Sequence, residues 1–267
     1  MGHSDPDFGP RGTYAMARPQ TTVAMGSSPQ QIRKVVLKMT RRLRILSIGI
    51  ALIGIGFIAA GGFAYMKTQE GYRSLNAFSA AQHVTLTYND QGQLVDGDDT
   101  GEAQAILALL KSDWGFPVVD SELDPNDPVI NTASEYMYQM ATVTYHTLHA
   151  TTTVVVPETV EYNGEVIKAG EYEFVNDGRY WVDFDRMHPI EGPARAQIWS
   201  PTAHALIGEL GVGTATASAL QLGLAIAALF AGVGAAFLVI GAGVLWVTRA
   251  ATEAESVPVL KPAAVIA

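Results

Sequence analysis

The stretch "ILSIGIALIGIGFIAAGGFAYM", residues 45–66, contains no charged residue and decides the class of fold. As an α-helix it would be about 33 Å long, enough to cross the hydrocarbon core of a bilayer. A second apolar run, "ALQLGLAIAALFAGVGAAFLVIGAGVLWV", covers residues 219–247. The two runs predict a membrane α-helical protein with two transmembrane helices.

A cleaved signal peptide is the alternative interpretation of the first run. Signal peptides have an apolar region of about 7–15 residues close to the N-terminus, whereas this run is longer and begins only after residue 44. The preceding "TRRLRIL", residues 40–46, resembles a twin-arginine export signal in Arg41 and Arg42, but Arg44 stands where an apolar residue is expected. These observations favour a transmembrane helix.

Charged residues flank the first run unevenly and predict the orientation of the chain. Residues 1–44 carry eight Lys or Arg and two Asp, whereas residues 67–209 carry seven Lys or Arg and 22 Asp or Glu. Because basic flanks stay in the cytoplasm, we expect both termini to be cytoplasmic and residues 67–209 to lie outside the plasma membrane. The acidity of this segment excludes nucleic acid as a partner, since phosphates require a basic surface.

Composition divides the chain into five segments. They are a disordered cytoplasmic tail, a basic juxtamembrane helix with the first transmembrane helix, an α+β extracytoplasmic domain, the second transmembrane helix with its outer extension, and a cytoplasmic tail. Their boundaries are residues 1–28, 29–66, 67–209, 210–248 and 249–267. The chain has no Cys, so no disulfide supports the outer domain, and its fold must rest on core packing.

Capping patterns predict where the helices of the outer domain begin. Asp99 with Glu102 has capping-box spacing, as has Thr132 with Glu135. Ser200–Pro201 combines a favoured cap residue with the favoured first helical residue. The last of these helices is expected to continue straight into the second span.

Turn residues and alternating patterns predict the strands. A hairpin is expected to turn at Asp90–Gly92, and three or four strands are expected within residues 151–185. Turns are predicted at Asn163–Gly164 and Asp177–Gly178. The last of these strands is predicted to bury one face formed by Tyr180, Val182 and Phe184.

Two histidines three residues apart, His146 and His149, are candidate metal ligands. In a helix they share a polar face with Glu135, Gln139 and Thr142. The opposite face is predicted to be the core side: Tyr136, Met137, Met140, Thr144, Thr147 and Leu148. A solvated face is the preferred interpretation of the polar side, with partner contact and metal binding by His146, His149 and Glu135 as alternatives. A zinc site needs a third and a fourth ligand, and no H-E-x-x-H or Cys cluster supplies them.

The acidic loop "DSELDPNDP", residues 120–128, suggests calcium through its alternating Asp120, Glu122 and Asp124. An EF-hand loop requires Gly at its sixth position and Glu at its twelfth. Pro125 and Asn131 occupy those positions here. A solvated acidic turn is therefore the preferred interpretation.

Catalytic and cofactor motifs are missing from the sequence. It contains no G-x-S-x-G, no S-x-x-K before a suitable helix and no P-loop. The glycines of "GIALIGIGF", residues 49–57, lie in an apolar run with no preceding strand, so they do not form a dinucleotide fingerprint. Neither apolar run contains Asp, Glu, Lys, Arg or His, which disfavours an ion or proton pathway. We therefore predict no cofactor and no catalytic activity.

Small residues in the two apolar runs predict helix packing, because they let membrane helices approach closely. In the first run, one side carries Gly49, Gly56, Ala60 and Ala64, and a second side, roughly 120° away, carries Ser47, Gly54 and Gly61. In the second run, one face carries Gly223, Ala227, Gly234 and Gly241, and a nearly opposite face carries Ala225, Gly232, Ala236 and Gly243. One face per helix is enough to pair the two helices, so the second face predicts a further helix.

The segment "GPARAQIWSPTAHALIGELGVGTATASALQLGLAIAALFAGVGAAF", residues 192–237, resembles uncharacterised two-pass membrane proteins of actinobacteria. The architecture of residues 45–247, with a basic N-terminal flank and a large acidic outer loop, is similar too. Some similar proteins are labelled ring-opening dioxygenases, an activity that requires a metal-binding site not located in this sequence. Other small actinobacterial membrane proteins with outer domains are accessory subunits of respiratory supercomplexes.

The lack of a recognisable nucleophile, cofactor loop or complete metal set, with the compatible shape, predicts a structural or accessory subunit of an envelope or respiratory-type membrane complex. Its expected partners are membrane lipid and other membrane-protein subunits or further copies of the chain. The alternative is an extracytoplasmic metal-binding domain or metalloenzyme that uses His146 and His149.

Overall fold

Two long helices flank a mixed helical and stranded region in the computed structural model, which describes residues 29–256. Helix α1 spans Pro29–Gln82 and helix α5 spans Pro201–Ser256. The chain divides into two units, residues 50–240 and the paired segments 1–49 and 241–267. The tail predicted over residues 1–28 and the end of the tail predicted over 249–267 lie outside the described residues.

Both long helices are long and apolar enough to cross a membrane. Only 11% of the most apolar window of each helix is buried, and side chains such as Leu52, Phe63 and Leu229 are about 60% exposed. The core helix of a soluble protein would bury such side chains. The structure therefore confirms two apolar helices of spanning length beside a small stranded region.

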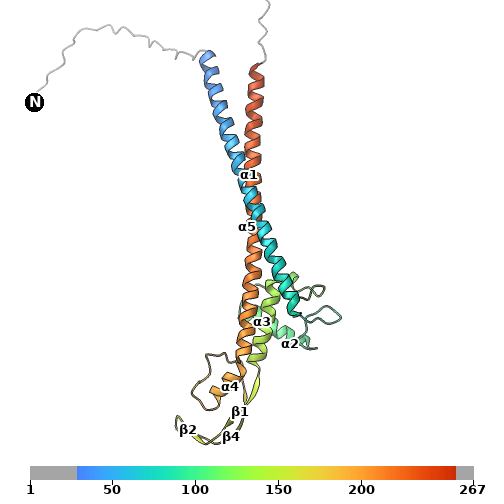
Figure 1. The fold of residues 1–267 in the computed structure, drawn as a ribbon, viewed down its shortest axis with the longest axis vertical. Coiled ribbons are helices and arrows are strands. Elements are labelled where there is room, and N and C mark those ends of the chain that lie inside the picture. The colour runs from blue at the N-terminus through green and yellow to red at the C-terminus, as the bar shows by residue number, and fades with distance from the viewer. Residues whose placement is uncertain (1–28, 257–267) are drawn as a thin grey trace, which may run out of the picture. The chain divides into compact units, whose positions relative to one another are not determined.

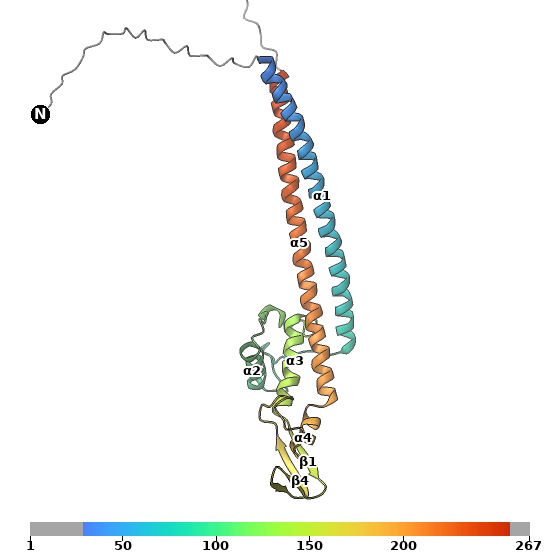
Figure 2. The same ribbon diagram turned by 90° about the vertical axis from the view of Figure 1, so that its left-hand side faces the viewer.

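Within residues 50–240, α1 and α5 lie side by side and antiparallel (Figures 1 and 2). Buried residues of α1 recur every seven positions at Gly54, Gly61, Thr68 and Leu75, and Ser79 is buried one turn further on. In α5, buried Gly213, Ala227 and Gly234 follow the same spacing with half-buried Leu220 between them, and Ala217 is buried as well. A seven-residue repeat is the period of a left-handed coiled coil, and here most of its positions hold small residues.

The second unit pairs the start of α1 with the end of α5. Arg44 Nη2 donates a hydrogen bond to the carbonyl oxygen of Thr248 at 3.1 Å. Ser47 is fully buried, and its hydroxyl donates to the carbonyl oxygen of Leu43 at 2.6 Å. Buried Gly241 and Thr248 continue the seven-residue spacing of α5 within this unit.

Helices α2 and α3 form the first core of the region between the two long helices, together with the C-terminal end of α1 and the N-terminal part of α5. Helix α2 spans Thr100–Ala108 and continues as a π-helical turn over Leu109–Asp113, and α3 spans Ala133–Leu148. A short 3₁₀ turn, Asp120–Glu122, connects them. The buried core residues are Leu75, Leu86, Ile106, Leu110, Ile130, Ala133, Tyr136, Tyr138, Ala141 and Ala217.

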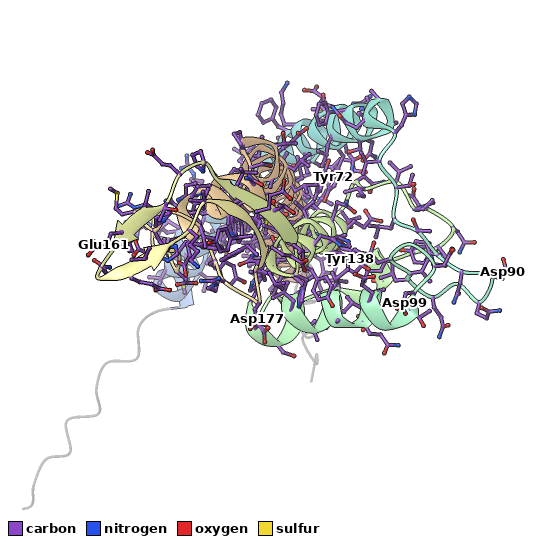
Figure 3. The ribbon with its side chains drawn as sticks, turned by 90° about the horizontal axis from the view of Figure 1, so that it is seen from below. Tyr72, Asp90, Asp99, Tyr138, Glu161 and Asp177 are labelled. Carbon is purple, nitrogen blue, oxygen red and sulfur yellow. The ribbon has the colours of Figure 1, made fainter. Side chains whose placement is uncertain are left out.

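A second core lies between the strands and helix α4, Glu191–Ile198. Strand β1, Thr151–Val156, pairs antiparallel with β4, Gly170–Val175, with Thr151 opposite Val175. Strands β2, Val160–Tyr162, and β3, Glu165–Ile167, form a hairpin. The core residues are Leu109, Leu148, Val154, Phe174, Phe184, Ala194, Ile198 and Trp199. Seen from below, Tyr138 lies among the helices, whereas Asp90 and Glu161 lie toward opposite edges (Figure 3).

Most predicted caps and turns are confirmed. Thr132 and Glu135 form a reciprocal capping box, and α5 begins at Pro201 with Ser200 Oγ accepting from the Ala203 amide. The β2–β3 turn at Asn163–Gly164 has positive φ at both residues, as a type I′ turn requires. The hairpin predicted at Asp90–Gly92 is reduced to one bridge, between Tyr88 and Leu94.

The strand predicted from the alternation of Tyr180, Val182 and Phe184 is wrong. These residues form turns, with Phe184 buried and Val182 82% exposed. The segment has no neighbouring strand among the described residues, and alternation alone cannot supply the missing backbone hydrogen bonds.

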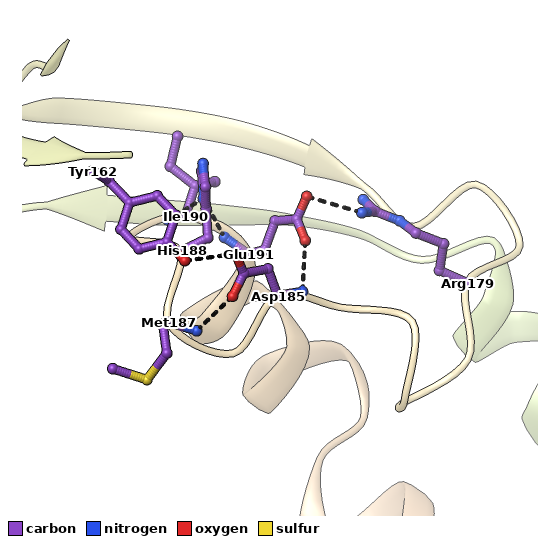
Figure 4. A network of polar contacts seen from close by, with 7 residues as sticks. All are labelled: Tyr162, Arg179, Asp185, Met187, His188, Ile190 and Glu191. Atoms are coloured by element: carbon purple, nitrogen blue, oxygen red, sulfur yellow. Dashed lines mark hydrogen bonds and ion pairs between the residues drawn. The ribbon is translucent and has the colours of Figure 1, made fainter. Parts of the chain in front are cut away.

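Polar contacts hold this irregular segment instead (Figure 4). Glu191 accepts from Arg179 Nη1 at 3.1 Å and from the Asp185 amide at 2.9 Å. Asp185 accepts from the Tyr162 hydroxyl at 2.6 Å and from the Met187 amide at 3.0 Å. These hydrogen bonds lower the pKa of the Asp185 carboxyl and raise that of the Tyr162 hydroxyl. Through Asp185, the segment therefore connects Tyr162 of the β2–β3 hairpin with Glu191 of α4.

Candidate functional sites

His146 lies against two carboxylates that come from the start of α2. Its Nε2 atom is 2.6 Å from Asp96 Oδ2, and its Nδ1 atom is 3.9 Å from Glu102 Oε1. Asp96 and Asp99 exchange backbone hydrogen bonds of 3.1 and 3.0 Å, which fixes Asp96 just before the helix. One exposed imidazole on α3 thus faces two carboxylates of the α2 region.

This cluster combines ligand types that bind zinc and similar divalent cations. One ligand atom from each of Asp96, Glu102 and His146 lies within 4.8 Å of the others. The two imidazole nitrogens point in different directions, so a single ion would use only one of them and water would complete its shell. The side chain of His146 is 53% exposed and that of Asp96 20%, which leaves the cluster accessible from solvent.

The acidic cluster also affects a buried tyrosine. Tyr138 is 3% exposed, and burial raises the pKa of its hydroxyl, with the charges of Asp96 and Glu102 adding to the rise. Tyr88 follows the same pattern, since burial and then the charge of Glu135 raise its pKa to about 12. Both phenols therefore remain neutral at physiological pH. Neither hydroxyl has a hydrogen-bond partner among the described residues.

The structure does not bring together the three candidate ligands taken from the sequence. Glu135 lies at the start of α3, 11 residues from His146, which is about 16 Å along a helix. Its Oε2 atom accepts from the amides of Asn131 and Thr132 and from the Thr132 hydroxyl, at 2.8–2.9 Å. His149 caps the other end, with Nδ1 2.8 Å from the Tyr145 carbonyl oxygen.

The solvated face predicted for α3 is therefore only partly correct. His146 and His149 are exposed, but Glu135 is 2% exposed. Tyr138 and Ala141, absent from the predicted core face, are buried, while Met137 and Met140 are half-buried. Helix α3 is enclosed on several sides by α2 and the long helices, so a two-faced pattern describes it poorly.

The three carboxylates proposed for calcium each have a different partner. Asp120 pairs with Lys111 at 2.9 Å, and Glu122 Oε2 accepts from the Ser134 amide at 3.0 Å. Asp124 accepts from the Asn126 amide and side chain, both at 2.8 Å, which lowers the pKa of its carboxyl. This geometry favours the acidic turn over a calcium loop.

The small residues of the two long helices separate into packed and open positions. A methyl group added to Gly54 or Gly61 would lie 2.8 Å from a carbonyl oxygen of α5, and one added to Gly223 would lie 2.5 Å from Thr68 Oγ1. Gly234 faces Gly54 in the same way. The side of α1 that packs in this unit is therefore the one carrying Gly54 and Gly61.

The other predicted small-residue faces are open. No atom of the described residues lies within 4 Å of a methyl group added at Gly49, Gly56, Gly232 or Gly243. Ala60 is exposed, whereas Gly241 is buried within the unit formed by the two helix ends. Each long helix thus carries one occupied and one open set of small residues.

Comparison with known proteins gives no family assignment: no family model, curated protein or solved structure matches the chain.

Sequence reasoning missed Asp96 and Glu102 as neighbours of His146. The available signal was the acidic segment "DGDDTGE", residues 96–102, but its proximity to α3 depends on the tertiary fold.

Proposed function

We propose that this chain is a two-pass protein of the plasma membrane and acts as a structural or accessory subunit of a larger membrane complex. Both termini are cytoplasmic, and the region between the two spans lies outside. The charge difference between residues 1–44 and 67–209 supports this orientation. We propose no catalytic activity for the chain itself.

The open set of small residues on α5 carries this proposal. The face with Gly223 and Gly234 packs on α1, whereas Gly232 and Gly243 have no contact within 4 Å. Within a bilayer, association depends on close van der Waals packing, because lipid removes the hydrophobic drive between helices. An exposed second face of this kind is suited to a helix of another subunit or of a second copy.

The test is a size series at the open positions, followed by native mass spectrometry of the complex purified from its own membrane. Changing Gly232 and Gly243 to Ala should preserve the complex, whereas changing both to Leu should release the partner. A Cβ atom added at either position meets no described atom within 4 Å, so the protein itself should stay folded. If the Leu variant retains the native mass of the complex, the open face is not the contact and the proposal fails.

Orientation has its own test. A reporter that is active only outside the cytoplasm should be active when inserted at Ser121 and inactive when fused after Ala267. An active C-terminal fusion would contradict the proposed topology.

A second candidate function is metal binding by the outer region, and the Asp96–Glu102–His146 cluster favours it. His149 provides a matched control, because it is exposed on the same helix but caps the helix end instead of facing the carboxylates. Purified wild-type protein and the His149→Ala variant should bind zinc in titration calorimetry, and His146→Ala should not. Equal zinc binding by the two variants would exclude this site.

A further inference from the structure

An apolar cavity of about 420 Å³ lies between α1, α3 and α5. Its walls include Leu75 and Phe78 of α1, Val143 of α3, and Leu206 and Leu210 of α5. All of these residues belong to the unit formed by residues 50–240. The cavity is within the size range of sites for small ligands.

Tyr136 and Gly213 shape this cavity. A methyl group on Gly213 would clash with the Tyr136 ring, so only glycine lets the ring lie directly against α5. The Tyr136 hydroxyl is 2.7 Å from Ser79 Oγ, a hydrogen bond that joins α3 to α1. Because these two hydroxyls satisfy each other, the wall they form presents mainly carbon to the cavity.

The cavity lies just beyond the apolar runs of both helices. Leu75 follows the last residue of the first run, Met66, by nine positions, or about 14 Å of helix. On α5, the lining residue Thr216 comes three positions before the second run begins at Ala219. Exposed apolar side chains border it, including Phe78 at 48% and Val212 at 67%.

We propose that this cavity binds one hydrocarbon chain of a membrane lipid, an inference that rests on the membrane insertion proposed above. Glu209 is the only charged residue in the lining, so the cavity offers no cation to a phosphate or carboxylate headgroup. Covering apolar surface of this kind is favourable, because the surface is removed from water. The adjoining bilayer is the nearest source of long apolar chains, whereas a partner helix, about 10–12 Å across, needs an open groove.

Photo-crosslinking in nanodiscs tests this inference. The probe is a phosphatidylglycerol with a diazirine at the end of one chain, diluted into phosphatidylethanolamine, and labelled residues are mapped by mass spectrometry. Adducts are expected in the apolar runs 45–66 and 219–247, and also on α3 near Val143. Helix α3 lies outside both runs, so label there reports a chain in the cavity.

Filling the cavity provides the decisive comparison. Val143→Trp, and separately Leu206→Trp at the exposed border, should lower labelling of α3 about tenfold while labelling of the two runs stays constant. Leu222→Trp, on an exposed position of α5 outside the lining, should leave both signals unchanged. Thermal unfolding of each variant shows whether it is folded.

The outcomes separate the two proposals. Label in the runs without label on α3, or label on α3 that neither filling variant reduces, overturns the lipid site and leaves membrane insertion intact. Absence of label from the runs overturns membrane insertion and the lipid site with it.

Discussion

Gly54 of α1 and Gly234 of α5 meet backbone to backbone. A methyl group on Gly54 would lie 2.8 Å from the carbonyl oxygen of Gly234, and one on Gly234 would lie 2.6 Å from that of Gly54. Backbone atoms cannot rotate away as side chains can, so neither position tolerates a larger residue without separating the helices.

Substitution of Gly54 by Leu is therefore expected to destabilise the helix pair. Overpacking of a tight interface costs about 1–3 kcal/mol, and the variant should unfold at a lower temperature in detergent. Gly56→Leu is the matched control, because it adds the same side chain two residues away where nothing lies within 4 Å. Circular dichroism can compare the two; equal melting temperatures would show that this contact does not stabilise the protein.

The capping box of α3 gives a second prediction. Thr132→Ala removes the acceptor for the Glu135 amide and a donor to the Glu135 carboxylate. Loss of such a cap costs about 1 kcal/mol, which should appear as a lower midpoint in urea unfolding of the region between the two long helices. Thr142→Ala is the control, since its hydroxyl bonds only to the Tyr138 carbonyl within the same helix. A similar loss in both variants would contradict a specific role for the cap.

The buried carboxyl of Glu135 predicts a pH dependence. Burial raises its pKa above 4.5, although the hydrogen bonds from Asn131 and Thr132 oppose the rise. A raised pKa in the folded state contributes stability below the unfolded value, and that contribution is lost as the pH rises through the folded value. The free energy of unfolding of the wild type relative to Glu135→Gln should therefore fall as the pH increases from about 4.5.

Urea unfolding of both proteins between pH 4 and pH 8, in steps of about half a pH unit, measures this difference. The Gln side chain does not titrate, so the other groups cancel in the comparison. A difference that grows with pH would reverse the sign and show that the hydrogen bonds outweigh burial.

Asn176 gives a prediction for the second core. It is fully buried, and its Nδ2 atom donates to the Thr147 carbonyl oxygen at 2.7 Å. Asn176→Ala leaves that carbonyl without this donor, at a cost of about 1–3 kcal/mol. Asn176→Asp should destabilise more, because it places a carboxylate against the same carbonyl oxygen. Thermal unfolding ranks the variants; a smaller effect of Asp would mean that the site opens to water.

Local chemistry made several elements predictable. The caps at Thr132 and Ser200 and the turn at Asn163–Gly164 depend on residues within four positions of one another, so the sequence contains the whole interaction. The length and apolarity of the two long helices are likewise properties of contiguous segments.

Contacts between distant segments were not predictable. Asp96 meets His146 only because α2 packs on α3, and the acidic segment 96–102 does not by itself indicate that pairing. Both small-residue faces of the first run satisfied the same packing rule, and the register with α5 selected the one with Gly54 and Gly61. Alternation at Tyr180, Val182 and Phe184 was misleading because no strand within residues 29–256 pairs with this segment.

The pairing of Gly54 with Gly234 also has a consequence for biosynthesis. These residues are 180 positions apart, and at about 5–20 residues per second the ribosome needs about 9–36 s to make the intervening chain. During that interval α1 exists without α5, and its glycine face is available to any other helix nearby. Correct assembly therefore requires that this face have little affinity for competing helices during that interval.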